Sequence, residues 1–234
     1  MTSGKGSDMG FNRRTTAALV QSGVALTSAM AGIGMRFAAV PAEEPNIEDT
    51  LIAASIEGME RDDLRVLSVL VTWLGVHRAR INADRLMRAA STLEQPRSLA
   101  FWAAVASWQG TDRRFTRMAH LCAGKRVDLL GVGTGFQVKR KGEDDRFRGT
   151  CLRVPEGALR DRAGDVEQPS ELARRHVTYR WRVIMGPSYR ADMWASLSCD
   201  PTLSASELAR RTYGSFATAW QVKRDFAMVG GGEG

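Results

Sequence analysis

Apolar residues recur at helical spacing through most of the first 110 residues. Leu64, Leu67, Val71 and Leu74 fall on one face of a helix, and Trp73 widens that face. We therefore expect this helix at the centre of an N-terminal core. The other helices that the pattern predicts in this part cover about 15–30, 47–57, 82–89 and 98–110.

Polar residues stand where these helices are expected to begin. Asn46 is a good N-cap, and Asp49 suits the positive end of the helix that follows it. Asp62 or Asp63 can cap the central helix, and Asn82 can cap the next one. The caps and the apolar spacing together predict a helical domain over residues 15–125.

An aromatic and alanine-rich run, SLAFWAAVASW, begins at Ser98. Its aromatic residues are Phe101, Trp102 and Trp108. Aromatic residues at helical spacing are more often core than surface, and we interpret them as core. The alternative is a stripe that binds a protein partner. The helical domain as a whole is apolar enough to self-associate.

The chain changes character at Arg113, where basic residues become frequent. Two segments, 135–141 and 147–154, flank a polar turn at 142–145, which predicts a β-hairpin. We expect its cations to lie along a phosphate backbone, with a solvated strand face as the alternative. These cations are Lys139, Arg140, Lys141, Arg146, Arg148 and Arg153.

A further helix is predicted from Pro169, at or just before its first turn, to about Met185. The residues expected to face inward are Leu172, Val177, Trp181 and Ile184. Those expected to face outward, where they would add to the basic surface, are Arg174, Arg175, Arg180 and Arg182.

The stretch from Ser188 to Val229 predicts three short helices separated by two breaks, at about 189–198, 206–212 and 215–228. Ser204 and Glu207 fit a capping box at the start of the second helix. Gly214 suits the next turn because glycine is free to take a positive φ. The buried stripe expected on the third helix is Ala219, Val222 and Phe226.

Composition indicates a globular protein with an anionic partner. The 234 residues are 44% hydrophobic and carry a formal net charge of +7. Residues 1–112 hold 11 Lys and Arg against 12 Asp and Glu, whereas residues 113–190 hold 18 against 9 and residues 191–234 hold 4 against 5. The excess therefore lies in the middle of the chain, and nucleic acid is the first partner it suggests.

Several kinds of chemistry lack a supporting pattern. Cys122, Cys151 and Cys199 form no CxxC pair, so we expect neither a metal site nor a disulfide framework, and a reduced cytoplasmic setting. No run of about 18 apolar residues predicts a membrane span. The three histidines have no metal-ligand spacing and no activating partner, so we expect no enzyme and no cofactor.

One glycine-rich stretch resembles a cofactor-binding motif. The sequence VDLLGVGTG at 127–135 is similar to the first motif of S-adenosylmethionine-dependent methyltransferases, in which glycines admit the cofactor close to the backbone. The βα units that such a domain needs do not follow here. We therefore interpret the stretch as a glycine-rich entry to the hairpin.

The C-terminal line LSASELARRTYGSFATAWQVKRDF resembles bacterial winged-helix regulators of the MarR/ArsR kind. In that family an LSxxELAxR helix precedes the recognition helix. The resemblance implies that Gln221 and Arg224 read base edges while Ser215 and Thr218 contact phosphates. Trp220 and Lys223 complete the DNA-binding set on this helix. The alternative is a three-helix unit for dimerisation or partner docking.

These observations predict a mainly α protein with an N-terminal helical domain and a C-terminal winged-helix-like helix-turn-helix preceded by a short β-hairpin. The expected parts are a disordered tail at 1–14, the helical domain at 15–125, the basic hairpin and helix-turn-helix region at 126–229, and a flexible tail at 230–234. The expected function is a transcriptional regulator that binds double-stranded DNA as a homodimer. The alternative is an antitoxin or adaptor that binds a protein partner through the helical N-terminal domain.

Overall fold

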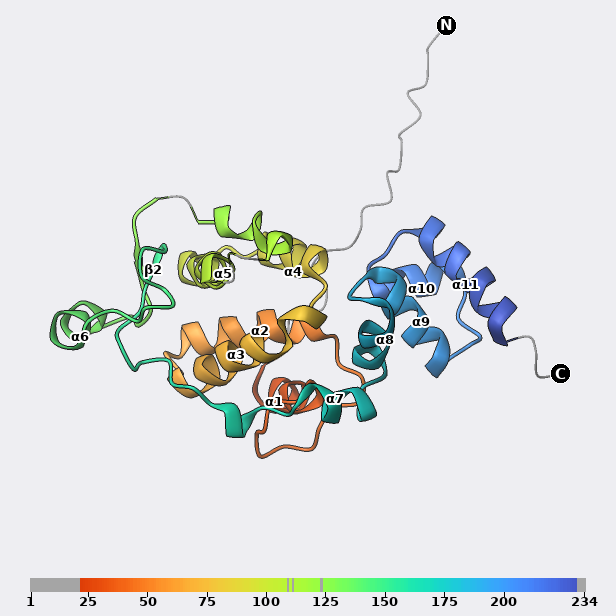
Figure 1. Ribbon diagram of the computed structural model, residues 1–234, viewed down its shortest axis with the longest axis horizontal. Coiled ribbons are helices and arrows are strands. Elements are labelled where there is room, and N and C mark those ends of the chain that lie inside the picture. The colour runs from red at the N-terminus through yellow and green to blue at the C-terminus, as the bar shows by residue number, and fades with distance from the viewer. Residues whose placement is uncertain (1–21, 109, 111, 123, 231–234) are drawn as a thin grey trace, which may run out of the picture.

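The computed structural model describes residues 22–108, 110, 112–122 and 124–230, which form a mainly α-helical protein (Figure 1). The tail predicted at 1–14, residues 15–21 of the first expected helix and residues 231–234 lie outside the described residues. The first half contains α1 (Gly23–Gly32), α2 (Ile47–Glu60), α3 (Leu64–His77), α4 (Ala83–Ala90) and α5 (Pro96–Trp108). Short 3₁₀ turns follow α3 and α5, namely η1 (Arg78–Arg80), η2 (Arg113–Phe115) and η3 (Met118–His120).

The predicted caps of three helices are confirmed. The Asn46 side chain accepts from the Asp49 amide at 3.0 Å at the start of α2. The Asp63 carboxylate accepts from two backbone amides at the start of α3, and Asn82 accepts from the Arg85 amide at 3.2 Å in α4. Each bond satisfies an amide that has no partner within its own helix.

The helical body (α1–α7) is built around α2, which packs against α1, α3, α4 and α5. Trp73 on α3 and Trp102 on α5 are fully buried, and the Trp73 indole donates to the Ile33 carbonyl at 2.7 Å. Phe101 is also fully buried, so the interpretation of the aromatic run as core is confirmed for Phe101 and Trp102. The same hydrophobic cluster extends through Leu129 and Leu152 to Tyr179, so the junction expected at 125/126 falls inside it.

The predicted β-hairpin is wrong. Residues 134–141 form a helix, α6 (Thr134–Lys141), and strand β2 (Leu152–Arg153) pairs in parallel with β1 (Val127–Asp128). This pairing buries Leu152 against the body, whereas a hairpin would leave β1 without a partner. The alternation of residues suggested a strand with one buried face, but Phe136, which would lie on that face, is 69% exposed. Gln, Lys and Arg are good helix formers, and glycines of positive φ at 133 and 142 bound the helix.

The helix predicted from Pro169 to Met185 is two helices. After η4 (Ala163–Asp165), α7 (Pro169–Arg175) begins with proline in its first turn, as predicted, and α8 (Val177–Met185) starts anew after His176. The extended backbone at His176 changes the phase of the second helix. Tyr179 and Arg182 therefore face inward, and Ile184, which was expected inward, is 66% exposed.

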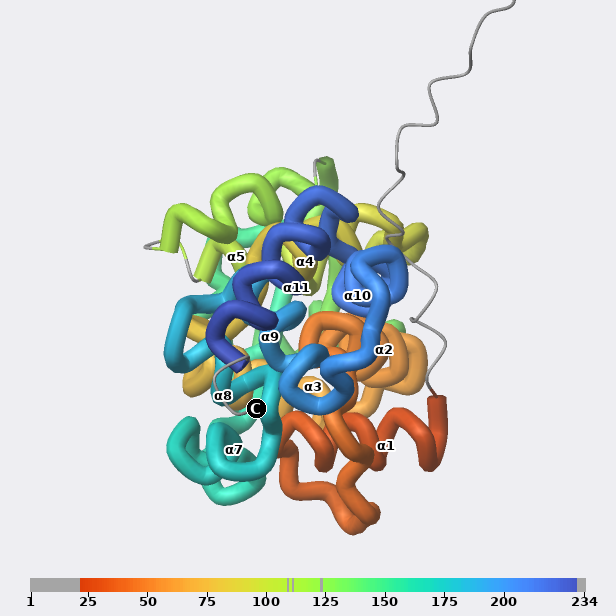
Figure 2. The backbone as a smooth tube through the Cα atoms, turned by 90° about the vertical axis from the view of Figure 1, so that its right-hand side faces the viewer, coloured from red at the N-terminus to blue at the C-terminus, as the bar shows by residue number. Residues whose placement is uncertain are grey.

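The C-terminal helices form a second core. They are α9 (Tyr189–Cys199), α10 (Ala205–Thr212) and α11 (Phe216–Gly230), and we call them the three-helix unit. Their buried side chains form a separate cluster, which Trp181 of α8 joins from outside. Figure 2 shows α11 facing the viewer, in front of the helices of the body. The members of the cluster are Met193, Trp194, Leu197, Leu203, Leu208, Ala209, Ala219 and Val222.

The turn between α10 and α11 differs from the prediction in one detail. Tyr213, rather than Gly214, has the positive φ, at 58°. Gly214 suits the turn for a different reason, since a Cβ at this position would lie 2.3 Å from the end of the Met193 side chain, which would have to shift. The glycine therefore permits a close approach of the turn to α9.

Candidate nucleic-acid interface

The N-terminus of α11 is held by its own hydroxyl groups. Ser215 accepts from the Thr218 amide at 3.1 Å, and the Ser215 and Thr218 hydroxyls are hydrogen-bonded to each other at 2.7 Å. Ser215 thus acts as the N-cap of this helix. Both side chains are half-buried, and their mutual bond occupies part of the hydrogen-bonding capacity that phosphate contacts would use.

The exposed face of α11 carries three of the predicted contacts. Gln221 and Arg224 are exposed, and the Trp220 side chain on the same face is 54% exposed. The Arg224 guanidinium lies 5.4 Å from the centre of the Trp220 ring, a cation–π distance. Ala219 and Val222 are buried on the opposite side, and Phe226 is partly buried, 5.1 Å from Trp194 between ring centres. The stripe expected on this helix is therefore confirmed.

Lys223 has a structural role. Its ammonium donates a hydrogen bond to the Leu203 carbonyl, in the loop that precedes α10. This bond fixes α11 to the loop, so Lys223 is not free to contact a ligand in the described conformation.

The start of α10 follows half of the predicted capping box. The Ser204 hydroxyl accepts from the Glu207 amide at 3.1 Å, as predicted. The hydrogen bonds of the Glu207 carboxylate go instead to Arg210 and Arg211, which lower the pKa of Glu207 to about 2. The expected return bond to the Ser204 backbone is therefore replaced by ion pairs along the surface of α10.

Arg182 joins the three-helix unit to the body, a role that the sequence analysis missed. Its side chain was expected to face outward but is fully buried between Glu48 of α2 and Asp192 of α9. Its guanidinium lies 2.6 and 2.9 Å from the Glu48 oxygens and 2.7 and 3.0 Å from the Asp192 oxygens. Burial lowers the pKa of the guanidinium, but the two carboxylates outweigh it and raise the pKa overall, so the group stays charged.

A second buried pair lies beside the first. Arg85 of α4 pairs with Asp49 of α2, and the Tyr213 hydroxyl donates to the same carboxylate at 2.9 Å. The Arg85 guanidinium also lies 3.5 Å from the centre of the Tyr213 ring. Because Tyr213 occupies the turn that leads into α11, this contact fixes the start of α11 relative to the body.

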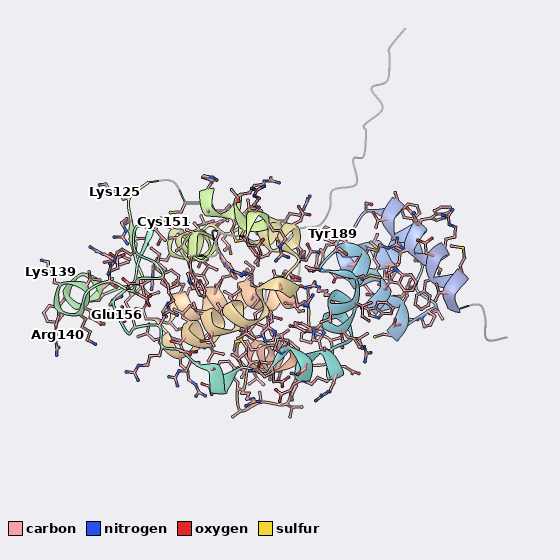
Figure 3. The ribbon with its side chains drawn as sticks, in the orientation of Figure 1. Lys125, Lys139, Arg140, Cys151, Glu156 and Tyr189 are labelled. Atoms are coloured by element: carbon pink, nitrogen blue, oxygen red, sulfur yellow. The ribbon has the colours of Figure 1, made fainter. Side chains whose placement is uncertain are left out.

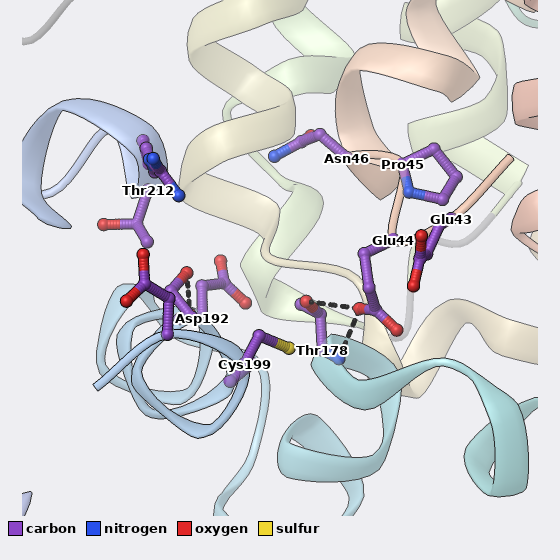
Figure 4. A pocket seen from close by; sticks show the side chains of 12 residues that line it. Glu43, Glu44, Pro45, Asn46, Thr178, Asp192, Cys199 and Thr212 are labelled. Atoms are coloured by element: carbon purple, nitrogen blue, oxygen red, sulfur yellow. Dashed lines mark hydrogen bonds between the residues drawn. The ribbon is translucent and has the colours of Figure 1, made fainter. Parts of the chain in front are cut away.

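A cavity of about 420 Å³ lies at the same junction (Figure 4). Glu44 of the α1–α2 loop accepts there from the Val177 and Thr178 amides at 2.5 and 3.0 Å and so caps α8. Cys199 and Asp192 line the side formed by α9. Glu44 and Asp192 therefore have partners within the fold, since Asp192 pairs with Arg182.

The cations of α6 are exposed and have no partner among the described side chains. Lys139, Arg140 and Lys141 project from the end of the molecule, as Figure 3 shows for the first two. The other cations that were assigned to the hairpin are paired with carboxylates: Arg146 with Asp144, Arg148 with Asp145, and Arg153 with Asp128. Pairing reduces the local excess charge, so α6 carries most of what remains.

The two arginines of α7 differ from each other. Arg175 donates to the Gly32 and Ala31 carbonyls at 2.7 and 2.8 Å and pairs with Glu167, so it caps the C-terminus of α1. Arg174 is exposed and has no hydrogen-bonded side chain among the described residues. The structure therefore assigns Arg175 to the fold and leaves Arg174 accessible.

The predicted contacts do not form one surface. In Figure 1, α6 lies at one end of the long axis and α11 at the other. Among the described residues, no group of three or more His, Cys, Asp or Glu side chains could hold a metal ion. Nor is any helix in the described part of the chain long and apolar enough to cross a membrane.

Comparison with known proteins yields no match to a family model, to a curated protein or to a solved structure.

Proposed function

We propose that this protein binds double-stranded DNA through the three-helix unit, with α11 as the recognition helix. The proposal rests mainly on one observation, namely that α11 packs on a separate small core while Gln221 and Arg224 remain exposed on its outer face. An amide and a guanidinium on one exposed helix face suit hydrogen bonding to base edges in a major groove. Regulation of transcription is the activity that this mode of binding would serve.

In this proposal the two ends of the molecule have different tasks. Gln221 and Arg224 select the sequence, and the Ser215 cap keeps the helix start in place. The Lys139–Lys141 cations of α6 attract phosphates without reading sequence. Because α6 and α11 lie at opposite ends, a short duplex held on α11 would not reach α6 of the same chain (Figure 1). Long DNA, or a second chain in a homodimer, would bring both into use.

A gel-shift titration at two salt concentrations tests this proposal with random and genomic duplexes. We expect Gln221→Ala combined with Arg224→Ala to weaken specific binding by about 30-fold or more, since two good base contacts together contribute about 2–6 kcal/mol. Arg61→Ala removes an exposed arginine that follows α2 and should leave binding unchanged. Replacing Lys139, Arg140 and Lys141 with alanine should lower the salt slope on long duplexes by about 2–3.

The titration also has a clear negative outcome. Absence of binding to any duplex at low salt would rule out the proposed function. Equal binding by the wild type and the Gln221→Ala, Arg224→Ala variant would remove α11 from the interface.

A second candidate function is docking of a protein partner, as an antitoxin or adaptor would do. It is supported by Phe216 and Trp220, which lie one turn apart on α11 and are 44% and 54% exposed. Exposed aromatic side chains are more typical of protein interfaces than of major-groove contacts. Trp220→Ala separates the candidates: loss of a co-purifying partner with unchanged DNA affinity would favour docking, whereas loss of DNA affinity would favour DNA binding.

A further inference from the structure

Two apolar side chains are exposed at the start of α6. Val132, in the loop before the helix, is 88% exposed, and Phe136, in the first turn of the helix, is 69% exposed. Leu129 and Leu130, just before them, belong to or pack against the hydrophobic cluster of the body, but Val132 and Phe136 do not. Apolar side chains that remain in water contribute little to folding. The fold therefore gives these two residues no role.

The free cations of α6 lie next to Phe136. Residues three and four positions apart share a face of a helix, so Phe136 lies on the same face as Lys139 and Arg140. In Figure 1, α6 forms one end of the long axis of the molecule, and in Figure 3 Lys139 and Arg140 project from that end. The outermost surface of the protein there combines an aromatic ring with positive charge.

The free charge at this end of the molecule is mainly positive. Lys125 is also exposed, and Figure 3 shows it at the same end as Lys139 and Arg140. Glu156 is exposed beside α6, where its amide donates to the Gly142 carbonyl at 3.1 Å, and its carboxylate has no partner in the described part of the chain. Lys125 and the three cations of α6 outnumber this carboxylate. A partner of this surface must therefore be negatively charged.

We propose that α6 and the loop before it dock the protein on the surface of a bilayer that contains anionic phospholipids. The cations Lys139, Arg140 and Lys141 lie among the lipid phosphates. Phe136 and Val132 enter the boundary between the headgroups and the acyl chains, where their apolar surface leaves water. The contact is peripheral, and it does not depend on DNA binding by α11.

The exposed apolar pair favours a bilayer over a DNA duplex as the partner of this surface. The phosphates of a duplex attract the same cations, as in the function proposed above. A duplex offers no apolar layer to Val132 and Phe136 unless they separate two stacked base pairs, which costs free energy. An anionic bilayer supplies a negatively charged layer and hydrocarbon directly beneath it. The two partners would compete for the cations of α6.

Co-sedimentation of the full chain with lipid vesicles tests the charge that the proposal requires. We expect binding to vesicles of phosphatidylcholine mixed with phosphatidylglycerol and no binding to phosphatidylcholine alone. Replacing Lys139, Arg140 and Lys141 with alanine should weaken binding about 100-fold, since each cation near an anionic membrane contributes about a factor of 5. Absence of wild-type binding to the mixed vesicles would overturn the proposal.

A second variant tests the apolar part of the contact. Val132→Ser combined with Phe136→Ser keeps every charge and should weaken binding to the mixed vesicles by about 10-fold or more, because less apolar surface leaves water. The control is Val24→Ser combined with Val40→Ser, which changes two valines, 82% and 83% exposed, that lie outside α6. This control should bind as the wild type does.

The outcomes distinguish a bilayer from simple attraction and from DNA. Unchanged vesicle binding by the Val132→Ser, Phe136→Ser variant would overturn the proposal, because the cations alone would then account for binding. Weaker duplex binding by this variant, without vesicle binding by the wild type, would assign the surface to DNA instead.

Hydrogen exchange of the wild type locates the contact without any variant. Mixed vesicles should slow exchange of the backbone amides within residues 131–142 and leave those of α11 unchanged. Slowed exchange at α11 with no change in residues 131–142 would overturn the proposal.

Discussion

The three-helix unit and helix α6 are both candidate DNA contacts, but they are held in different ways. The unit has its own buried cluster and is joined to the body by Arg182 and Arg85, whose ion pairs are buried. Helix α6 buries little beyond Thr134 and is bounded by glycines. The unit is therefore positioned by long-range contacts, whereas α6 presents cations that the fold does not need.

The two regions therefore suit different parts of DNA binding, since one holds a helix in a fixed orientation and the other offers positive charge to phosphates. A helix that reads base edges must be held in one direction, because hydrogen bonds to bases tolerate little displacement. Cations that attract phosphates act over several ångströms and need no fixed direction. The contrast agrees with the tasks proposed for α11 and α6, and mutations can test it at the level of stability.

The largest expected effect is at Arg182. Arg182→Met leaves Glu48 and Asp192 buried without their cation, and we expect a loss of about 3–5 kcal/mol in the free energy of unfolding. Urea denaturation measures it. Arg180→Met, at an exposed position of the same helix, should change stability by less than about 0.5 kcal/mol. Equal effects of the two variants would show that the buried pairs do not hold the unit.

An intermediate effect is expected at His77 of α3, which contacts Tyr179 of α8. His77 stacks on Trp73, with ring centres 4.6 Å apart. Its Nε2–H donates to the Glu167 carbonyl at 3.1 Å, and its Nδ1 accepts from the Tyr179 hydroxyl at 2.7 Å. Burial lowers the pKa of His77 to about 4. The imidazole is therefore neutral in the folded protein and protonates more readily in the unfolded chain.

The lowered pKa of His77 makes the folded protein less stable at lower pH. Above pH 6.5 both states are neutral at His77, and stability falls as the pH decreases from 6.5 to about 4. We expect the wild type to lose up to about 3 kcal/mol more than His77→Gln over this range. Denaturation at several pH values measures the difference, and His120→Gln, at an exposed position, should keep the wild-type slope. Burial also lowers the pKa of His176, which contributes equally in all these proteins.

The smallest effect is expected at α6. Replacing Lys139, Arg140 and Lys141 with alanine removes no described hydrogen bond or ion pair of their side chains, so stability should change by less than about 0.5 kcal/mol. Urea denaturation next to the Arg182→Met variant gives the comparison directly. A loss above about 1 kcal/mol would mean that these cations stabilise the fold, and would end the distinction between the two regions.

Local signals in the sequence predicted most of the helices. The caps at Asn46, Asp63, Asn82 and Ser204, and the stripe of Ala219 and Val222, depend on residues no more than four positions apart. Such short-range patterns can be read without knowledge of the fold. The segment at 134–141 was too short to tell a helix from a strand, and its alternating residues favoured the wrong choice.

The sequence by itself determined the mainly α class, the capped helices and the exposure of Gln221 and Arg224 on α11, because these follow from contacts within one or two helical turns. Only the tertiary structure decided which cations are free. Arg182 meets Glu48 across 134 positions, and Arg175 meets Gly32 across 143. The local sequence around a charged side chain does not show which distant group it will pair with. The role of such a side chain depends on which distant group the packing of the helices brings within hydrogen-bonding distance.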